Sequence, residues 1–214
     1  RFVLSKGHAA PALYSVLANR GYFDVSELKT LRHIGSFLQG HPDMKHIPGV
    51  DMSSGSLGQG ISAACGMALS AKHFKNNFKV FTILGDGEIE EGQVWEAAMF
   101  AGNKGLDNLT AFIDLNNLQI DGTIDEVNSA KPVDKKFEAF NWHTITIDGH
   151  DFEQIEAALK EAETVNKPVA IIANTVKGKG VSFMENQVSW HGSAPNDEQY
   201  EIAMNELKAY KAAL

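Results

Sequence analysis

The stretch LGDGEIEEGQVWEA, residues 84–97, decides how the fold is predicted from this sequence. It begins where the short apolar run Lys79–Leu84 ends, and that run has the character of a buried strand. Beyond the stretch, Gln93–Asn103 has the pattern of a helix. A single carboxylate, Asp86, therefore lies between Gly85 and Gly87, at the point where a strand ends and the chain turns towards a helix.

The same alternation of short apolar runs and helical segments continues towards the end of the chain. Strands are predicted at Lys79–Leu84, Leu109–Leu115, His143–Ile147 and Val169–Asn174. Helices are predicted at Gln93–Asn103, Val133–Phe140 and Phe152–Glu163. The strands are nearly continuous in apolar residues, which indicates burial on both faces. The predicted fold class is α/β: a doubly wound, mostly parallel sheet with helices on both faces and right-handed crossovers.

The remaining segments frame this core. Further helices are predicted at His8–Ala18, Asp24–His33, Gly58–Phe74 and Asn196–Leu214, with a long loop over residues 34–57. Long loops in compact domains are often functional. We expect residues 1–195 to form one domain and residues 196–214 a C-terminal helix or linker. Because the chain starts at Arg1, we also expect that its N-terminus is truncated.

Composition excludes several classes of function. The 214 residues are 43% hydrophobic and carry a formal charge of −8, which argues against nucleic-acid binding and against attraction to anionic membranes. No apolar stretch approaches the roughly 18 residues of a membrane span, and no signal peptide is visible. The single cysteine, Cys65, cannot form an internal disulfide. These features predict a cytoplasmic protein.

Two polar side chains follow neighbouring predicted strands. Asp86 comes after the first strand and Asn116 after the second, 30 residues later. In open parallel sheets, ligands bind beyond the carboxyl ends of the strands. A carboxylate and an amide carbonyl suit a hard divalent cation such as Mg²⁺, whose coordination is completed by phosphate oxygens. The flanking glycines allow a phosphate to approach the backbone closely. The sequence therefore predicts a seat for a metal and a diphosphate.

This pattern alone leaves alternatives open. An isolated GDG is a common turn, and a phosphatase or a nucleotide-binding domain could contain the same residues. A P-loop is disfavoured because the sequence has no GxxxxGK[ST] motif. The second strand with its DLNN sequence makes the pattern more specific than GDG by itself.

The sequence resembles transketolase, in its thiamine diphosphate-binding (diphosphate, or PP) domain. GDG followed by Asn116 has the form of the thiamine diphosphate motif. The other matching segments occur in the family's order along nearly the whole chain: LSKGHA (4–9), GHP (40–42), SGSLGQG (54–60), DLNNLQIDG (114–122), TVKGKG (175–180) and WHGSAP (190–195). The resemblance is to this domain in full-length transketolase or in the N-terminal subunit of a split one.

The resemblance implies a role for each matching residue. Asp86, Asn116 and the backbone carbonyl of Leu118 would ligate Mg²⁺ or Ca²⁺. His8, His41 and His191 would act in catalysis, and histidine suits proton transfer because it titrates near neutral pH. The cofactor would contact Gly55, Ser56, Leu57, Gly85, Asp86, Gly87, Glu91, Asn116, Lys177 and His191. The family often has Pro where this chain has Ser56, and we expect Glu88 and Glu90 to be solvated.

The resemblance also implies partners. The family's pyrimidine domain, absent from this sequence, carries the glutamate that protonates the cofactor and most arginines that bind substrate phosphates. We therefore expect a pyrimidine-domain (C-terminal) subunit, sugar phosphate substrates and a dimer or heterotetramer, with transfer of a two-carbon glycolaldehyde unit. The alternatives are an alpha-type subunit of another thiamine diphosphate enzyme, such as a 2-oxoacid dehydrogenase, and a non-catalytic cofactor-binding domain.

Overall fold

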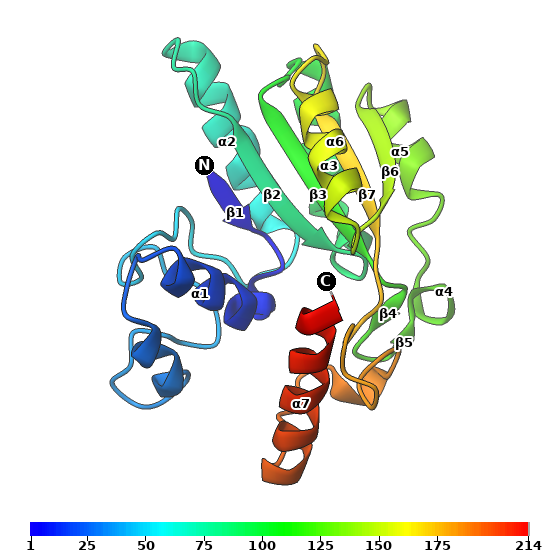
Figure 1. The fold of residues 1–214 in the computed structure, drawn as a ribbon. Helices are drawn as coiled ribbons and strands as arrows, with labels where there is room; N and C mark the ends of the chain where they lie inside the picture. The colour runs from blue at the N-terminus through cyan, green and yellow to red at the C-terminus, as the bar shows by residue number, and fades with distance from the viewer. Residues whose placement is uncertain (214) are drawn as a thin grey trace.

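The computed structural model describes residues 1–213 and contains a five-stranded parallel sheet (Figure 1). Its strands lie in the order β1-β2-β3-β7-β6. Their bounds are β1 Phe2–Leu4, β2 Val80–Gly85, β3 Leu109–Leu115, β6 His143–Asp148 and β7 Val169–Asn174. All four neighbouring pairs are parallel, with Gly85 of β2 opposite Asp114 of β3. The carboxyl ends of these strands therefore lie along one edge of the sheet.

Helices cover both faces of this sheet. Helices α2 (Gln59–His73), α3 (Gly92–Asn103) and α5 (Val133–Ala139) contribute to one core cluster, and α6 (Phe152–Ala162) contributes to another. Side chains of β7 alternate between the two clusters: Ala170 and Ile172 join the first, and Ile171 joins the second. This alternation confirms the predicted α/β class, because the central strand β7 is buried on both faces.

Shorter elements surround the sheet. They are η1 Gly7–Ala9, α1 Ala10–Asn19, η2 Val25–Thr30, η3 Glu88–Glu90, β4 Leu118–Gln119, β5 Gly122–Thr123, α4 Ile124–Val127, η4 Val188–Trp190 and α7 Asp197–Ala213. Helix α1 and the segment after it form a separate small core around Tyr14, Leu38 and Ile47. Figure 1 shows this region beside β1, and α7 extending away from the carboxyl edge of the sheet. The part of the predicted last helix at Leu214 lies outside the described residues.

One predicted helix is wrong. The Asp24–His33 segment forms only a 3-10 helix over Val25–Thr30. The Asp24 side chain accepts a hydrogen bond from the Ser26 amide and caps this helix. The helix ends early because Leu31 is extended and Arg32 takes a positive φ of 63°. The backbone thereby turns Leu28 and Leu31 towards the small core instead of continuing helically.

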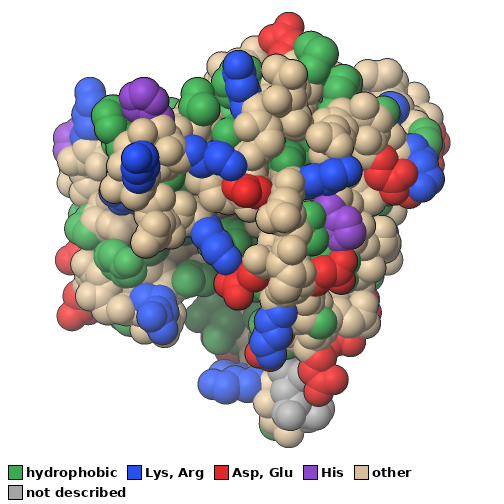
Figure 2. All heavy atoms as spheres, turned by 90° about the horizontal axis from the view of Figure 1, so that it is seen from above, with side chains coloured by type: hydrophobic (Ala, Val, Ile, Leu, Met, Phe, Trp, Pro, Cys, Tyr) green, Lys and Arg blue, Asp and Glu red, His purple; other side chains and the backbone are tan. Residues whose placement is uncertain are grey.

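No helix among residues 1–213 has both the length and the apolar character needed to cross a membrane. Figure 2 shows lysine, arginine, aspartate and glutamate side chains interspersed on one face of the molecule.

Candidate active site

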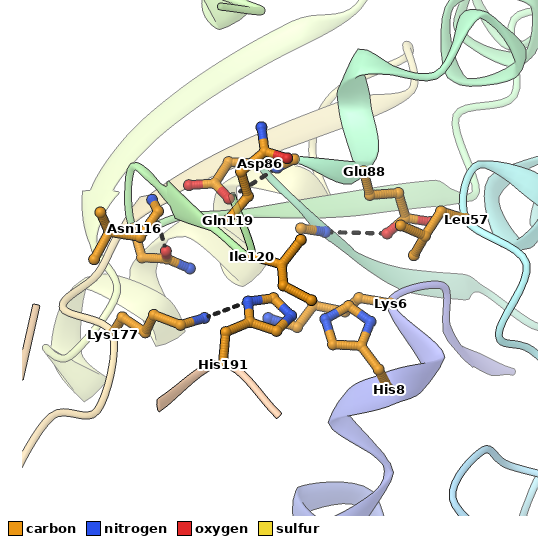
Figure 3. Close-up of a pocket in the computed structure, with 13 residues that line it drawn as sticks. Lys6, His8, Leu57, Asp86, Glu88, Asn116, Gln119, Ile120, Lys177 and His191 are labelled. Atoms are coloured by element: carbon orange, nitrogen blue, oxygen red, sulfur yellow. Dashed lines mark hydrogen bonds between the residues drawn. The ribbon is translucent and has the colours of Figure 1, made fainter. Parts of the chain in front are cut away.

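A cavity of about 270 Å³ lies at the carboxyl edge of the sheet (Figure 3). The loops that follow β1, β2, β3 and β7 all contribute to its wall. Nine of the residues predicted from the sequence line it: His8, Leu57, Gly85, Asp86, Gly87, Asn116, Leu118, Lys177 and His191. Segments separated by up to 183 positions, from His8 to His191, are thus brought to one place.

Asp86 is a buried carboxylate held by backbone amides. Its side chain accepts hydrogen bonds from the N–H of Gly87 at 2.9 Å and of Asn117 at 2.5 Å, and the residue is only 3% exposed. No ion pair among residues 1–213 includes it. Burial raises the pKa of Asp86, while the backbone hydrogen bonds oppose this shift. A buried carboxylate without a cationic side-chain partner, facing a cavity, fits a metal cation.

Asn116 and Leu118 lie beside Asp86 on the same wall. The Asn116 side-chain oxygen accepts the Leu118 N–H at 3.0 Å, and Asn117 between them has a positive φ of 65°. This tight turn leads into the β4–β5 hairpin and fixes the orientation of the amide. Within residues 1–213, no group of three or more His, Cys, Asp or Glu side chains is placed to hold a metal. One carboxylate with amide and backbone oxygens is instead a set that suits Mg²⁺ or Ca²⁺.

Two histidines and a lysine form the opposite side of the cavity. The rings of His8 and His191 stack with centroids 5.4 Å apart and planes inclined by 22° (Figure 3). Lys177 Nζ lies 3.1 Å from His191 Nδ1. Because a charged lysine can only donate, Nδ1 is the acceptor and the neutral ring carries its proton on Nε2.

These groups lower one another's proton affinity. Partial burial lowers the pKa of His8 to about 4, and repulsion from Lys6 and then from His191 once it is protonated adds to this effect. Burial and then Lys177 lower the pKa of His191. Burial and then Lys6 also lower the pKa of Lys177. Both imidazoles are therefore mainly neutral at pH 7 and able to accept a proton.

Lys6 is a site residue that the sequence analysis did not single out. Its Nζ donates to Asp114 Oδ2 at 2.5 Å, and the Thr175 hydroxyl donates to the other oxygen of the same carboxylate. Burial alone would raise the pKa of Asp114, but the charge of Lys6 together with the hydrogen bonds from Lys6 and Thr175 outweighs it, so that this pKa is lowered. Lys6 lies just after β1, a strand of three residues that is too short to be recognised from its sequence pattern.

Glu88 was predicted to be solvated, and this was wrong. The residue is 2% exposed and lines the cavity. The 3-10 turn Glu88–Glu90 folds its side chain back against the end of β2 instead of out to solvent. Gln119 and Ile120, from the β4–β5 hairpin, also line the cavity without having been predicted.

Four predicted residues lie outside the cavity lining. Gly55 has a φ of 150°, and a Cβ there would be 2.8 Å from His41 Cδ2, so that the His41 ring lies directly against Gly55. Ser56 and Glu91 are exposed, and the Glu91 side chain passes close to Gly58. These residues border the site without lining the cavity in this chain.

The cavity lies at the carboxyl edge of a parallel sheet and is lined by glycines, a buried carboxylate and two lysines. This arrangement is typical of an α/β domain that holds the phosphates of a cofactor. Residues 1–211 match the family model described as "Transketolase, thiamine diphosphate binding domain". The chain therefore belongs to this transketolase family.

Similar proteins include separate subunits and full-length enzymes. The chain is 48% identical over 211 residues to 6-deoxy-6-sulfo-D-fructose transketolase subunit SqwG of Clostridium sp. (strain MSTE9), covering 97% of this chain and 76% of that subunit. It is 42% identical to an apulose-4-phosphate transketolase subunit of Phocaeicola vulgatus, covering 97% and 74%. It is 50% identical to transketolase of Mus musculus, covering 97% of this chain and 33% of that enzyme.

A solved structure agrees with this assignment. Transketolase from Campylobacter jejuni superposes with a TM-score of 0.90 at 35% identity, covering 96% of this chain and 34% of that one. The chain thus spans about three quarters of the two bacterial subunits and about a third of the full-length enzymes. These relatives are named transketolases or their subunits, which favours transketolase over the 2-oxoacid dehydrogenase alternative.

Proposed function

We propose that this chain, together with a pyrimidine-domain partner subunit, transfers a two-carbon glycolaldehyde unit from a ketose phosphate to an aldose phosphate. The observation that carries the proposal is the cavity in which Asp86, Asn116, Lys177 and the His8–His191 pair meet. The two subunit relatives, three quarters of whose length this chain covers, support an assembly of separate chains. We further propose a dimer or heterotetramer located in the cytoplasm.

The cofactor's phosphates would lie against the GDG turn. Asp86, Asn116 and the Leu118 carbonyl would hold Mg²⁺ or Ca²⁺, which would bridge to the diphosphate. A Cβ at Gly85 would have no neighbour nearer than 3.8 Å, so the missing side chain leaves room for a close approach from the cavity. Lys177 would add positive charge from the other side. When bound, thiamine diphosphate supplies an electron sink for breaking and forming a carbon–carbon bond.

The histidines would handle the protons of this reaction. Cleavage of a ketose requires removal of a proton from a hydroxyl group, and the reverse step returns one. His8 is neutral at pH 7 because its pKa is lowered to about 4, and a neutral imidazole can accept such a proton. His191 presents its Nε2–H away from Lys177 and would donate a hydrogen bond to a substrate oxygen. His41, against Gly55, would complete this set at the entrance.

The test is transfer activity in the reconstituted complex. The chain is co-expressed with the pyrimidine-domain chain found beside it in its source, and ketol transfer is measured with thiamine diphosphate and Mg²⁺. A 2-oxoacid decarboxylation assay is run in parallel. We expect ketol transfer to be lost in His8→Ala and kept in His73→Ala, a variant on the distant surface. Decarboxylation without ketol transfer, or no turnover in a complex that binds the cofactor, would contradict the proposal.

A further inference from the structure

The Glu88 side chain joins three segments that are distant in the sequence. One of its oxygens accepts the Ser5 hydroxyl at 2.5 Å and the Gly58 N–H at 3.0 Å. The other oxygen accepts the Gly85 N–H at 3.1 Å. Ser5 follows β1, Gly85 ends β2, and Gly58 directly precedes α2. A single buried carboxylate therefore ties two strand ends to the beginning of a helix.

The surrounding packing leaves these segments little freedom to shift. A Cβ at Gly60, in the first turn of α2, would be 2.4 Å from Ser5 Oγ, so that the helix lies directly on the end of β1. Gly58 has a positive φ of 79°, and no side chain at the N-cap position bonds to the helix. The Glu88 carboxylate takes the Gly58 amide instead, and its negative charge lies where the helix dipole favours it.

The two tied backbone positions flank the residues that face the cofactor cavity. Gly58 follows Leu57, and Gly85 precedes Asp86; Leu57 and Asp86 both line the cavity. The separation of these two walls is therefore set through Glu88. We propose that Glu88 is a positioning residue that holds the Leu57 loop and the GDG turn at the spacing that the cofactor requires. This inference rests on the proposed function for its consequence, although the clamp itself is a property of the chain.

The arrangement depends on the two acceptor oxygens of Glu88. Three donors converge on the two oxygens, and an ionised carboxylate is an acceptor only. In Glu88→Gln the shape is kept, but one oxygen becomes an N–H₂ group that faces a donor. The variant therefore loosens the tie to Gly58 or Gly85 without creating a cavity.

The matched control is Glu90→Gln, which removes the same charge in the same turn. Glu90 accepts from Gln119 Nε2 at 2.8 Å, and a glutamine carbonyl can still accept that bond. A second control, Ile61→Val, removes one methylene group from a fully buried side chain of α2 and costs about 1 kcal/mol in stability without touching the clamp. It separates a loss of stability from a loss of positioning.

The experiment compares these variants in the complex of the chain with its partner. Amide hydrogen exchange is measured without cofactor on the peptides containing Gly58 and Gly85, and thiamine diphosphate affinity is measured by calorimetric titration with Mg²⁺. For Glu88→Gln we expect exchange at these amides and the dissociation constant each to rise about 10-fold. We expect kcat at saturating cofactor to stay within about twofold of the wild type, since a loss at the cofactor seat appears mainly in affinity. Ser5→Ala, which removes one donor, should give a smaller change in the same direction.

Unchanged exchange and affinity in Glu88→Gln, or equal losses in Ile61→Val, would overturn the inference. If Glu88→Gln did not fold, Ser5→Ala would decide between the same outcomes. A wild-type complex that bound no thiamine diphosphate would contradict the proposed function instead. The exchange at Gly58 and Gly85, measured without cofactor, would then still decide whether Glu88 holds the two segments together.

Discussion

The ion pair between Lys6 and Asp114 lies beside the cavity, and removing one of its two partners should destabilise the fold. The atoms are 2.5 Å apart, and the side chains are only 15% and 28% exposed. The Thr175 hydroxyl satisfies the second carboxylate oxygen. In Lys6→Met the apolar stem is kept, but Asp114 loses its charge partner while remaining largely buried.

The magnitude follows from this burial. Removing one partner of a fully buried pair costs roughly 3–5 kcal/mol. Because the pair is partly open to solvent, we expect Lys6→Met to lower the free energy of unfolding by about 2–3 kcal/mol. The double variant with Asp114→Asn should recover much of this loss, since the remaining carboxylate charge is then absent. The hydrogen bond from Thr175 to Asp114 also fixes the loop after β7, in which Lys177 follows two residues later.

The assay is urea unfolding followed by tryptophan fluorescence, to which the buried Trp142 contributes. The matched control is Lys79→Met, which breaks a surface pair with Glu163 at 3.0 Å whose side chains are 44% and 63% exposed. That loss should stay below about 1 kcal/mol. If Lys6→Met cost no more than Lys79→Met, the reasoning about burial would be refuted.

Three further predictions concern single residues. The pKa of His8 is about 4 in the folded chain against 6.5 for the free side chain, so as the pH falls from 6.5 to 4 the unfolded chain binds a proton that the folded chain does not. The free energy of unfolding should therefore fall over this window, and His8→Asn should flatten the fall. An NMR titration that gave the His8 ring an ordinary pKa would contradict this. Burial raises the pKa of the Cys65 thiol to about 12, so we expect iodoacetamide to label it at pH 7.5 only in the denatured chain, and labelling of the native protein at a comparable rate would count against its burial. In Gly102→Ala the new Cβ would be 1.7 Å from the Phe140 carbonyl oxygen, so a loss of about 3 kcal/mol or more in the free energy of unfolding is expected, and a loss under about 1 kcal/mol would show that the α3–α5 packing is looser than described.

The central part of the fold could be predicted because its strands are long and apolar. β7 is buried on both faces, and β2 and β3 are buried on one face and at least half-buried on the other, so their apolar pattern is nearly continuous. β1 could not be recognised, since three residues are too few to show a period. The Asp24–His33 segment was predicted as an α-helix because Leu28 and Leu31 have helical spacing, and the positive φ of Arg32 has no sequence signal comparable to a glycine.

The candidate site was predictable where a residue directly follows a strand. Asp86 and Asn116 were placed by the rule that ligands bind at the carboxyl ends of parallel strands, and both line the cavity. His8, Lys177 and His191 came only from the resemblance to a family, because nothing in their local sequence indicates that they meet. Glu88 was misjudged because its burial depends on how a 3-10 turn packs against β1 and α2, which local pattern does not contain.

Calorimetric titration of thiamine diphosphate into the complex, with Mg²⁺ and again after its removal by EDTA, is the decisive measurement for the cofactor seat. We expect binding that depends on the metal. In Asp86→Ala we expect a loss of affinity beyond the roughly 10–100-fold seen when outer partners of a metal site are removed. Tight binding that was unaffected both by EDTA and by Asp86→Ala would contradict the assignment of the cofactor seat to the GDG turn.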